Sequence, residues 1–401
     1  MPRVAAERLA EIGLTAARQM HATDPRPLDR AKAISALISA EALASERLGR
    51  LTDKVAAAML DANLFSIRLP VSAGGLSGSG VELFEATEEI ARADGSAGWC
   101  VLISNTANTF VHTGTGIAAH REVFGHGPVA CCGSLLPKAT SVEADGGFRV
   151  SGNFSWGSGS SLSRWVGVAE PISDRGGEQW FRAHVLPKDD VDITEGSWDV
   201  MGLRATASVD YVILDKFVPA HRTVEYPFLS DGNPRHVSTM GLIDLARPGV
   251  AAFASGLGLR ALDELIAAAP KTKRLLGEGM QSEDTVVQFG VGELEGRLRA
   301  ARGYYLDLVA EQDEALANGR HLNPDRTLDM RQALQTLTRA ARDMTVFAFD
   351  QAGTTVVHAA NPLQRCLRDI FTGLKHGIVT PAILGRIGKV RLGLDYGEIR
   401  L

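Results

Sequence analysis

Apolar residues recur at helical spacing in the first third of the chain. One set falls on a single helix face: Leu83, Phe84, Thr87, Ile90 and Ala91. The segment Asp94-Gly95-Ser96 interrupts this helix, and Trp99 opens a second apolar helix. Leu69-Pro70 and the Gly/Ser run from Gly74 to Gly80 predict a loop. We therefore expect a helical region up to about residue 125.

Short alternating runs replace this pattern between residues 126 and 230. The strand candidates are Phe148 to Phe154, Trp165 to Ala169, Trp180 to Leu186 and Tyr211 to Val218. Asp145-Gly146-Gly147 and Gly176-Gly177 separate such runs and predict tight turns. Several short strands at this spacing indicate a small barrel or a sandwich.

Helical spacing returns after residue 230 in two long seams. They consist of Val287, Val291, Leu294, Leu298, Ala301, Tyr305 and Leu308, then of Leu334, Leu337, Ala341, Met344 and Ala348. Spacings that alternate between four and three residues are typical of long packed helices, as in a four-helix bundle. Asn323-Pro324-Asp325 stands between the seams and predicts a loop and a helix start.

The order of helices, β block and helices predicts a mostly α protein of the α+β class. We expect three domains, at 1–125 (helical), 126–230 (β) and 231–401 (helical bundle). The sequence has no GxGxxG after a predicted strand and no Walker-type loop, so Rossmann and P-loop folds are disfavoured.

Composition narrows the class of protein. The 401 residues are 45% apolar and 22% charged, with a formal net charge of -5, so nucleic-acid binding has no electrostatic support. Charges interrupt the first twenty residues, unlike a secretory signal, and no stretch is apolar enough to cross a membrane. Cys100, Cys131, Cys132 and Cys366 lack zinc-ligand spacing, so we expect no metal and four reduced, mostly buried thiols in a cytoplasmic protein.

Four motifs carry a resemblance to a known family. They are Ala93 to Trp99 (Ala-Asp-Gly-Ser-Ala-Gly-Trp), Gly152 to Gly159, Trp198 to Thr206 with Tyr211 to Thr223, and Asn361 to Asp369 with His376. Together they resemble the acyl-CoA dehydrogenase-like flavoproteins, and the last motif resembles the oxygenase components of two-component aromatic hydroxylases. The resemblance implies the acyl-CoA dehydrogenase fold: an N-terminal helical domain, a middle β-barrel domain and a C-terminal four-helix bundle.

The resemblance also implies a reaction. The monooxygenase relatives take reduced FMN or FAD from a separate NAD(P)H:flavin reductase, form a C4a-hydroperoxyflavin with O2, and transfer one oxygen atom to a small molecule. Acyl-CoA dehydrogenases instead remove a substrate proton with a glutamate, but Gly353 to Val357 stands in place of their usual Tyr-Glu-Gly-Thr stretch. We expect hydroxylation of an aromatic or polycyclic compound; oxygenation of nitrogen or sulfur and acyl-CoA dehydrogenation are the alternatives. Relatives of this kind assemble as homotetramers.

Residues that match the family motifs are assigned expected roles. His376, placed on the same helix as Arg368-Asp369, is the expected proton donor or acceptor. Ser158 matches the position beside flavin N5, where a hydroxyl can donate or accept. Trp156 matches the ring that stacks near the flavin, although a shared strand face would also explain the spacing of Trp156 and Ser158.

The remaining matches concern the outer parts of the cofactor and the substrate. Thr354 and Thr355 match flavin contacts, or else form a helix-ending turn, and Lys273 and Arg274 can neutralise a flavin phosphate or remain solvated. Asn105 or Asn108 stands where related hydroxylases have a substrate-side histidine, and Ser134 matches a second substrate contact; simple polarity of the helix face would also explain the asparagines. Ala205 and Ala207 stand where relatives often have glycine.

Overall fold

The computed structural model describes residues 24–115, 117–175, 178–227, 242–273, 278–320 and 322–394. Helices occupy the N-terminal part: α2 (Pro27–Leu48), α3 (Asp53–Asp61), the 3-10 turns η1 (Leu64–Ser66) and η2 (Val71–Ala73), α4 (Gly80–Ala93), α5 (Gly95–Gly114) and α6 (Ile117–Phe124). The loop predicted around residues 74–80 is present. The interruption at 94–96 is confirmed as well, but α5 begins at Gly95, ahead of Trp99, because Asp94 caps it by accepting a hydrogen bond from the Ala97 N–H at 2.9 Å.

The β region forms two four-stranded sheets. The strands are β1 (Cys131–Pro137), β2 (Thr140–Ala144), β3 (Gly147–Gly157), β4 (Trp165–Arg175), β5 (Glu178–Pro187), β6 (Asp192–Thr194), β7 (Val209–Pro219) and β8 (Thr223–Pro227). One sheet has the order β1-β4-β5-β8 and the other β2-β3-β7-β6. Val166 and Leu186 of the first sheet share a buried core with Val150 and Ile213 of the second. Of the two predicted architectures, the β region is therefore the sandwich and not a barrel closed by hydrogen bonds. The predicted strands and the hairpin at Asp145–Gly147 are confirmed. The second predicted turn, Gly176-Gly177, lies outside the described residues.

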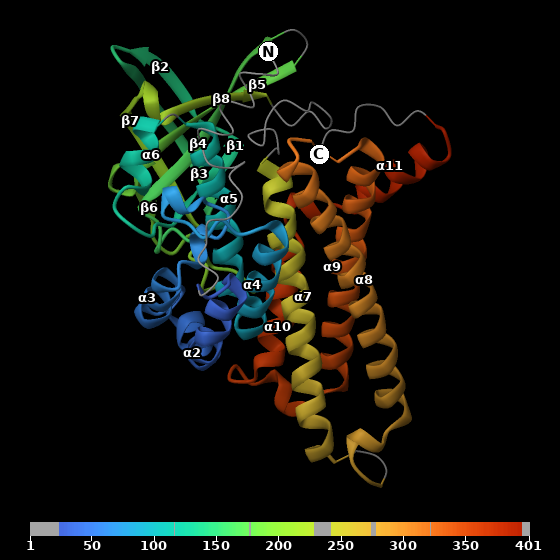
Figure 1. Cartoon of the computed structure of the whole chain (residues 1–401). Helices are drawn as coiled ribbons and strands as arrows, with labels where there is room; N and C mark the ends of the chain where they lie inside the picture. The colour runs from blue at the N-terminus through green and yellow to red at the C-terminus, as the bar shows by residue number, and fades with distance from the viewer. Residues whose placement is uncertain are drawn as a thin grey trace.

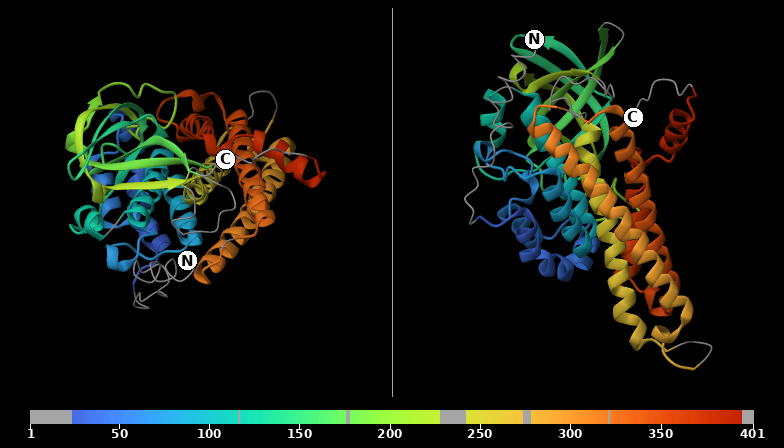
Figure 2. Two further views of the ribbon diagram at one scale, coloured as in Figure 1. Left: turned by 90° about the horizontal axis from the view of Figure 1, so that it is seen from above. Right: turned by 45° about the vertical axis from the view of Figure 1, so that its right-hand side comes forward.

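Long helices form the remainder of the molecule (Figures 1 and 2). They are α7 (Leu242–Ala268), α8 (Thr285–Ala317), α9 (Pro324–Gln351), α10 (Pro362–Gly373) and α11 (Ala382–Arg391), with short 3-10 turns η6 (Ala269–Lys271), η7 (Gln281–Glu283), η8 (Thr354–Val357) and η9 (Gly377–Val379). Both predicted seams lie on α8 and α9, and Asn323 caps α9 by accepting a hydrogen bond from the Arg326 N–H at 2.9 Å. The division into three domains at 125 and 230 stays a prediction.

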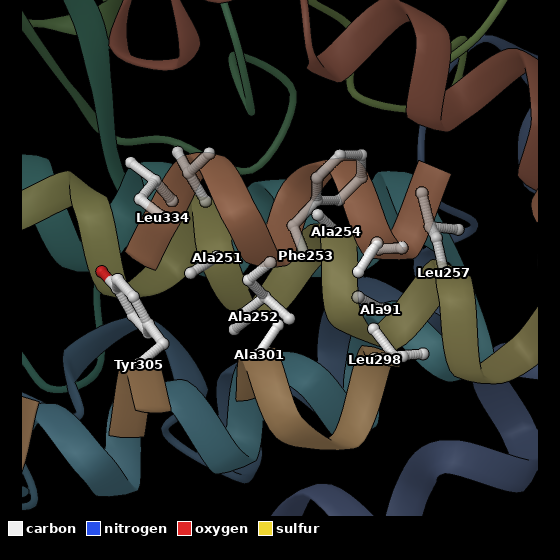
Figure 3. Packing of buried hydrophobic residues seen from close by; sticks show 14 of the residues in the cluster. Ala91, Ala251, Ala252, Phe253, Ala254, Leu257, Leu298, Ala301, Tyr305 and Leu334 are labelled. Carbon is white, nitrogen blue, oxygen red and sulfur yellow. The ribbon is translucent and has the colours of Figure 1, made fainter. Parts of the chain in front are cut away.

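Small residues of α7 let the neighbouring helices approach it closely. Figure 3 shows the alanines of α7 with Leu298 and Ala301 of α8 on one side and Leu334 of α9 on the other. The same core includes Trp99 of α5 and Phe253 of α7, whose rings meet edge to face at 5.0 Å. This packing fixes α5 against the bundle and thereby positions the site described below.

All four cysteines are free and buried. Burial raises the pKa of each thiol, to about 11 for Cys132 and about 12 for Cys366. Cys100 lies beneath the turn that contains Gly159, since a Cβ on that glycine would be 4.0 Å from the Cys100 sulfur. The thiols are therefore protonated across the neutral range.

Candidate active site

Trp99 joins two of the predicted site residues. Its indole Nε1–H donates a hydrogen bond to Ser158 Oγ at 3.3 Å, and its ring meets the His376 ring edge-on with centroids 5.7 Å apart. Trp99 comes from α5, Ser158 follows β3, and His376 follows α10. Three segments that lie far apart in the chain thus meet at one place.

His376 is not on the helix of Arg368 and Asp369, which corrects the sequence interpretation. The helix α10 ends at Gly373, and His376 is the N-cap of η9, where its Nδ1 accepts a hydrogen bond from the Ile378 N–H at 3.3 Å. An accepting Nδ1 carries no proton, so a neutral ring holds its proton on Nε2. Part of the side chain reaches solvent, yet the surrounding protein desolvates the ring and lowers its pKa below the ordinary 6.5. His376 is therefore a neutral imidazole at pH 7.

Trp156 holds an unusual backbone conformation. Its φ of 66° lies in the left-handed region, which costs a residue with a bulky side chain on the order of 1–3 kcal/mol. The pairing of β3 with β7 shifts register between Phe154 and Gly157, and the strand ends at Gly157 before Ser158. The regular alternation that a shared strand face requires is therefore absent. The indole is left 57% exposed.

A row of buried hydroxyl groups extends from Ser158. Ser158 Oγ lies 2.7 Å from Ser208 Oγ, which lies 2.6 Å from Thr206 Oγ1. The Thr206 hydroxyl donates to the backbone oxygen of Leu203 at 2.8 Å. Three side chains of this row, Ser158, Ser208 and Thr206, are 7%, 2% and 0% exposed.

A buried carboxylate fixes the far end of this row. Asp369 Oδ1 accepts a hydrogen bond from the Leu203 N–H at 2.6 Å. Burial first, and then the charge of Asp94, raise the pKa of Asp369 to about 7. The Arg365 guanidinium lies 3.6 Å from Asp94 Oδ2, and Arg368 donates to the Met201 carbonyl at 2.5 Å. The Arg-Asp part of the C-terminal motif therefore secures the loop that carries Leu203.

The loop itself is strained at two residues. Leu203 and Ala207 have φ values of 56° and 46°, and both are buried. Glycine adopts such angles without cost, whereas leucine and alanine do not. Ala205 is buried as well, in the core beneath α4 and α5.

The polar atoms of Asn105 and Asn108 are largely used within the protein. Asn105 Oδ1 accepts from the Ile67 N–H at 2.7 Å, and its Nδ2 donates to the Leu64 carbonyl at 2.7 Å. Asn108 Nδ2 donates to the carbonyls of Phe65 and Val129, at 2.8 and 2.9 Å. These bonds hold η1 and the start of β1 against α5. A substrate contact by either residue stays a prediction.

Ser134 lies on β1 of the sandwich. Its N–H donates to the Tyr211 oxygen at 2.9 Å, and the residue is 8% exposed. The preceding Gly133 has a φ of 146°, and a Cβ there would be 2.0 Å from the Gly167 oxygen, so β1 and β4 meet where only glycine fits. The substrate role of Ser134 also stays a prediction.

The other predicted flavin contacts lie at the opposite end of the bundle. Thr354 and Thr355 are exposed on η8, and a Cβ on the preceding Gly353 would be 3.6 Å from Thr272 Cγ2, beside Lys273. The twelve residues of α10 alone separate η8 from the region of His376 by about 18 Å. The structure therefore does not bring Thr354, Thr355 and Lys273 together with Ser158 and His376 within one chain. Arg274 lies outside the described residues.

A cleft opens next to His376. Among its lining residues are Arg247, Arg331, Gln335, Gly377 and Ile378, so it adjoins the site through the two residues after the histidine. Burial lowers the pKa of the Arg247 and Arg331 guanidinium groups to about 10, which leaves both charged at neutral pH. Among the described residues, no group of three or more His, Cys, Asp or Glu side chains is placed to hold a metal ion.

The surroundings of Ser158 suit a flat aromatic cofactor with polar edges. Trp156 offers an uncovered indole face, Ser158 offers a hydroxyl oxygen, and the neighbouring hydroxyl groups are uncharged. Such a combination of an aromatic surface and a few fixed polar groups is typical of cofactor sites. These residues fit the isoalloxazine ring of a flavin.

Comparison with known proteins defines the class. Residues 249–381 match the family model "Acyl-CoA dehydrogenase, C-terminal domain". The chain superposes on the structure of XiaF from Streptomyces sp. in complex with FADH2 and glycerol with a TM-score of 0.84, at 21% identity and with complete coverage of both chains. The fold is thus the acyl-CoA dehydrogenase-like fold, as the motifs predicted.

Two sequence relatives are oxygenase components of flavin-dependent monooxygenases. The chain is 27% identical over 368 residues to the flavin-dependent monooxygenase oxygenase subunit HsaA of Mycobacterium tuberculosis, with 89% of this chain and 93% of HsaA covered. It is also 27% identical over 391 residues to the oxygenase component of the FADH(2)-dependent resorcinol hydroxylase of Rhizobium sp., with 92% and 95% covered. Over most of its length the chain is thus similar to acyl-CoA dehydrogenase-like flavin-dependent monooxygenases, and it functions as the oxygenase component of a two-component system. Across the described residues, none of the helices is both long and apolar enough to span a membrane.

Sequence reasoning did not assign roles to several residues that build this site. Trp99 and Thr206 stood inside quoted motifs, but only the folded chain places them around Ser158. Ser208 lay between two motifs and carried no signal of its own. Asp369 appeared only as part of the C-terminal motif. A carboxylate on the apolar face of an amphipathic helix such as α10 could have indicated a buried hydrogen bond like the one it accepts from Leu203.

Proposed function

We propose that this oxygenase component hydroxylates an aromatic or polycyclic small molecule, using O2 and reduced FMN or FAD from a separate NAD(P)H:flavin reductase. The observation that carries the proposal is the meeting of Ser158 and His376 at Trp99. Reduced flavin supplies the two electrons that activate O2, and the activated oxygen reacts with the substrate. HsaA and the resorcinol hydroxylase are oxygenases of this type, and the second acts on an aromatic compound by its name.

The residues of this chain supply binding and proton control. The exposed Trp156 indole would provide a stacking surface for the flavin, and the Ser158 hydroxyl would interact with the flavin N5 edge, as the resemblance implies. His376, neutral and with its proton on Nε2, would donate that proton near the reacting oxygen. Trp99 couples the two residues because it contacts both. Substrate enters through the cleft lined by Gly377 and Ile378.

A homotetramer completes the proposed site. Thr354, Thr355 and Lys273 lie too far from Ser158 to bind the same flavin from one chain, so a neighbouring subunit presents them to it. Val286 and Phe289 of α8, 63% and 69% exposed, support an apolar contact between bundles. Light scattering would test this assembly, and a monomer at working concentration would refute it.

The test of the function is a product assay without a reductase. The protein is mixed with chemically reduced flavin, O2 and a panel of phenols, indoles and amines, and products are identified by mass. Hydroxylated phenols or indoles support the proposal, while N-oxides would replace it with the alternative chemistry. Bleaching of bound oxidised flavin by an acyl-CoA, with no oxygenated product, would instead indicate a dehydrogenase. Ser158→Ala should release hydrogen peroxide faster than the wild type.

A further inference from the structure

The row of hydroxyl groups behind Ser158 has a fixed direction. A backbone carbonyl can only accept a hydrogen bond, so the Thr206 hydroxyl gives its one proton to the Leu203 oxygen at 2.8 Å. Thr206 Oγ1 therefore accepts the hydrogen bond from Ser208 at 2.6 Å. Ser208 has then used its one proton, so it accepts the hydrogen bond from Ser158 at 2.7 Å. The reverse direction would leave two oxygen lone pairs facing each other at 2.8 Å without a proton between them.

The contacts at the other end of the row are compatible with this direction. An indole N–H can only donate, so Trp99 Nε1 gives its proton to Ser158 Oγ at 3.3 Å. The Ser158 backbone N–H is also engaged, by the Trp156 carbonyl at 2.8 Å. Ser158 therefore donates both of its polar hydrogens, on Oγ and on the backbone nitrogen, to acceptors within the protein. Within the described part of the chain, one lone pair of Ser158 Oγ keeps no partner.

The anchor of the row is held firmly. The Leu203 oxygen also accepts from Trp198 Nε1 at 2.9 Å, and the Leu203 N–H is bound by Asp369 at 2.6 Å. Thr206 and Ser208 are 0% and 2% exposed, so water does not compete for their protons. The direction of the hydroxyl row is thus set by groups that cannot turn.

We propose that Thr206 and Ser208 are positioning residues that keep the Ser158 hydroxyl a hydrogen-bond acceptor toward the flavin, so that the site favours a flavin whose N5 carries a proton. This inference rests on the proposed function, because it needs flavin N5 beside Ser158. A reduced flavin has an N5–H that can donate to the open lone pair. An oxidised flavin has a bare N5, which would face that lone pair without a proton. The site therefore selects reduced over oxidised flavin without any charged group.

The test compares the dissociation constants of oxidised and reduced flavin under anaerobic conditions. Ser208→Ala removes the acceptor of the Ser158 proton, so Ser158 can turn and donate to a bare N5. Thr206→Val removes the oxygen to which Ser208 donates. Among the described residues, the Ser208 proton can then be accepted only by Ser158 Oγ, so the direction of the row reverses. The substituted residue itself makes no hydrogen bond to Ser158. In both variants the ratio of the oxidised to the reduced dissociation constant should fall about tenfold, equal to about 30 mV in the two-electron potential of the bound flavin.

Matched variants distinguish an effect of hydrogen-bond direction from the effect of simply losing a buried hydroxyl. Thr206→Ser keeps the donor to Leu203 and should restore the wild-type ratio. Ser163→Ala removes another buried hydroxyl of the same turn, one that donates to the Gly159 carbonyl at 2.9 Å, and should leave the ratio unchanged. A spectroscopic readout uses oxidised flavin labelled with ¹⁵N at N5. Its resonance should be that of an unbonded nitrogen in the wild type and should move toward the hydrogen-bonded position in Thr206→Val.

The outcomes are distinguishable. A wild-type protein that binds neither form of flavin would overturn the proposed function itself. Tight binding of reduced flavin, with the same ratio in all variants, would overturn only the directed hydroxyl row. If Thr206→Val does not fold, the ratio in Ser208→Ala and the wild-type ¹⁵N resonance still test whether the hydroxyl row has the proposed direction. A hydrogen-bonded N5 in the wild-type oxidised complex would contradict the inference.

Discussion

Trp99 donates its indole N–H to Ser158 Oγ at 3.3 Å while its ring packs against Phe253. Trp99→Phe keeps an aromatic ring in that core and removes only the donor. The Ser158 hydroxyl then loses one of the two bonds that hold it, so we expect more hydrogen peroxide per hydroxylated product, by a few-fold up to about tenfold. Peroxide and product are measured in the same single-turnover reaction. Wild-type coupling in this variant would show that the indole N–H is not needed.

The pH dependence of the reaction should report on His376. Desolvation lowers the pKa of its imidazole, so the neutral form predominates at pH 7 and declines as the solution becomes more acidic. Protonation also removes the Nδ1 acceptor for the Ile378 N–H. Product yield should thus fall on the acid side, and His376→Ala should lower the yield and abolish this acid limb. A profile of the same shape in wild type and variant would contradict the assignment.

The stability of the protein should depend on pH through Asp369. Its folded-state pKa of about 7 lies above the ordinary 3.8, so between these values the folded state holds a proton that the unfolded state has lost. The free energy of unfolding therefore falls as the pH rises through this window, by up to about 1.4 kcal/mol per pH unit. Asp369→Asn keeps an acceptor for Leu203 and cannot ionise, so urea unfolding should depend less on pH.

A surface carboxylate is the control for this measurement. Asp215 is paired with Arg149, and the hydrogen bond from that guanidinium lowers the pKa of Asp215, so it is ionised throughout the window. Asp215→Asn should leave the slope between pH 4 and 7 as in the wild type. An equal change of slope in both variants would assign the effect to net charge rather than to the buried carboxyl.

The contact between α4 and α5 depends on Gly98. A Cβ at this position would lie 2.5 Å from Ala91 Cβ and 2.7 Å from Ala91 Cα, so Gly98→Ala should destabilise the fold by about 1–3 kcal/mol. Gly385 of α11 has no atom within 4 Å of its added Cβ, and the same substitution there should stabilise by about 0.5–1 kcal/mol. Thermal unfolding of both variants gives the comparison. A neutral Gly98→Ala would mean that the two helices can separate without cost.

The sequence predicted the elements well because their patterns are local. The seams of α8 and α9 and the hairpin at Asp145–Gly147 need only the spacing of neighbouring residues. The position of His376 could not be predicted in this way. The helix α10 ends at Gly373, where a Cβ would be 2.3 Å from Phe253. That contact joins residues far apart in the chain, so spacing alone could not reveal it.

The sequence indicated individual residues of the candidate site, but it could not predict how they are arranged in space. Ser158 and His376 were found from motifs, and their common neighbour Trp99 emerged only in three dimensions. Thr354 and Thr355 came from the same motif reasoning, yet α10 separates them from the other two. Motifs align residues with a family and do not say from which subunit each one acts. The bonds of Asn105 to η1 could not be foreseen either, because an exposed and a buried asparagine look alike in a sequence.

The burial of the four thiols has a consequence for an enzyme whose incomplete turnovers leak an oxidant. Hydrogen peroxide attacks the thiolate and hardly reacts with the thiol. Cys100, beneath the Gly159 turn, and Cys366, on α10, both stay protonated and covered. These thiols should therefore resist oxidation to sulfenic acid by the peroxide that the enzyme releases.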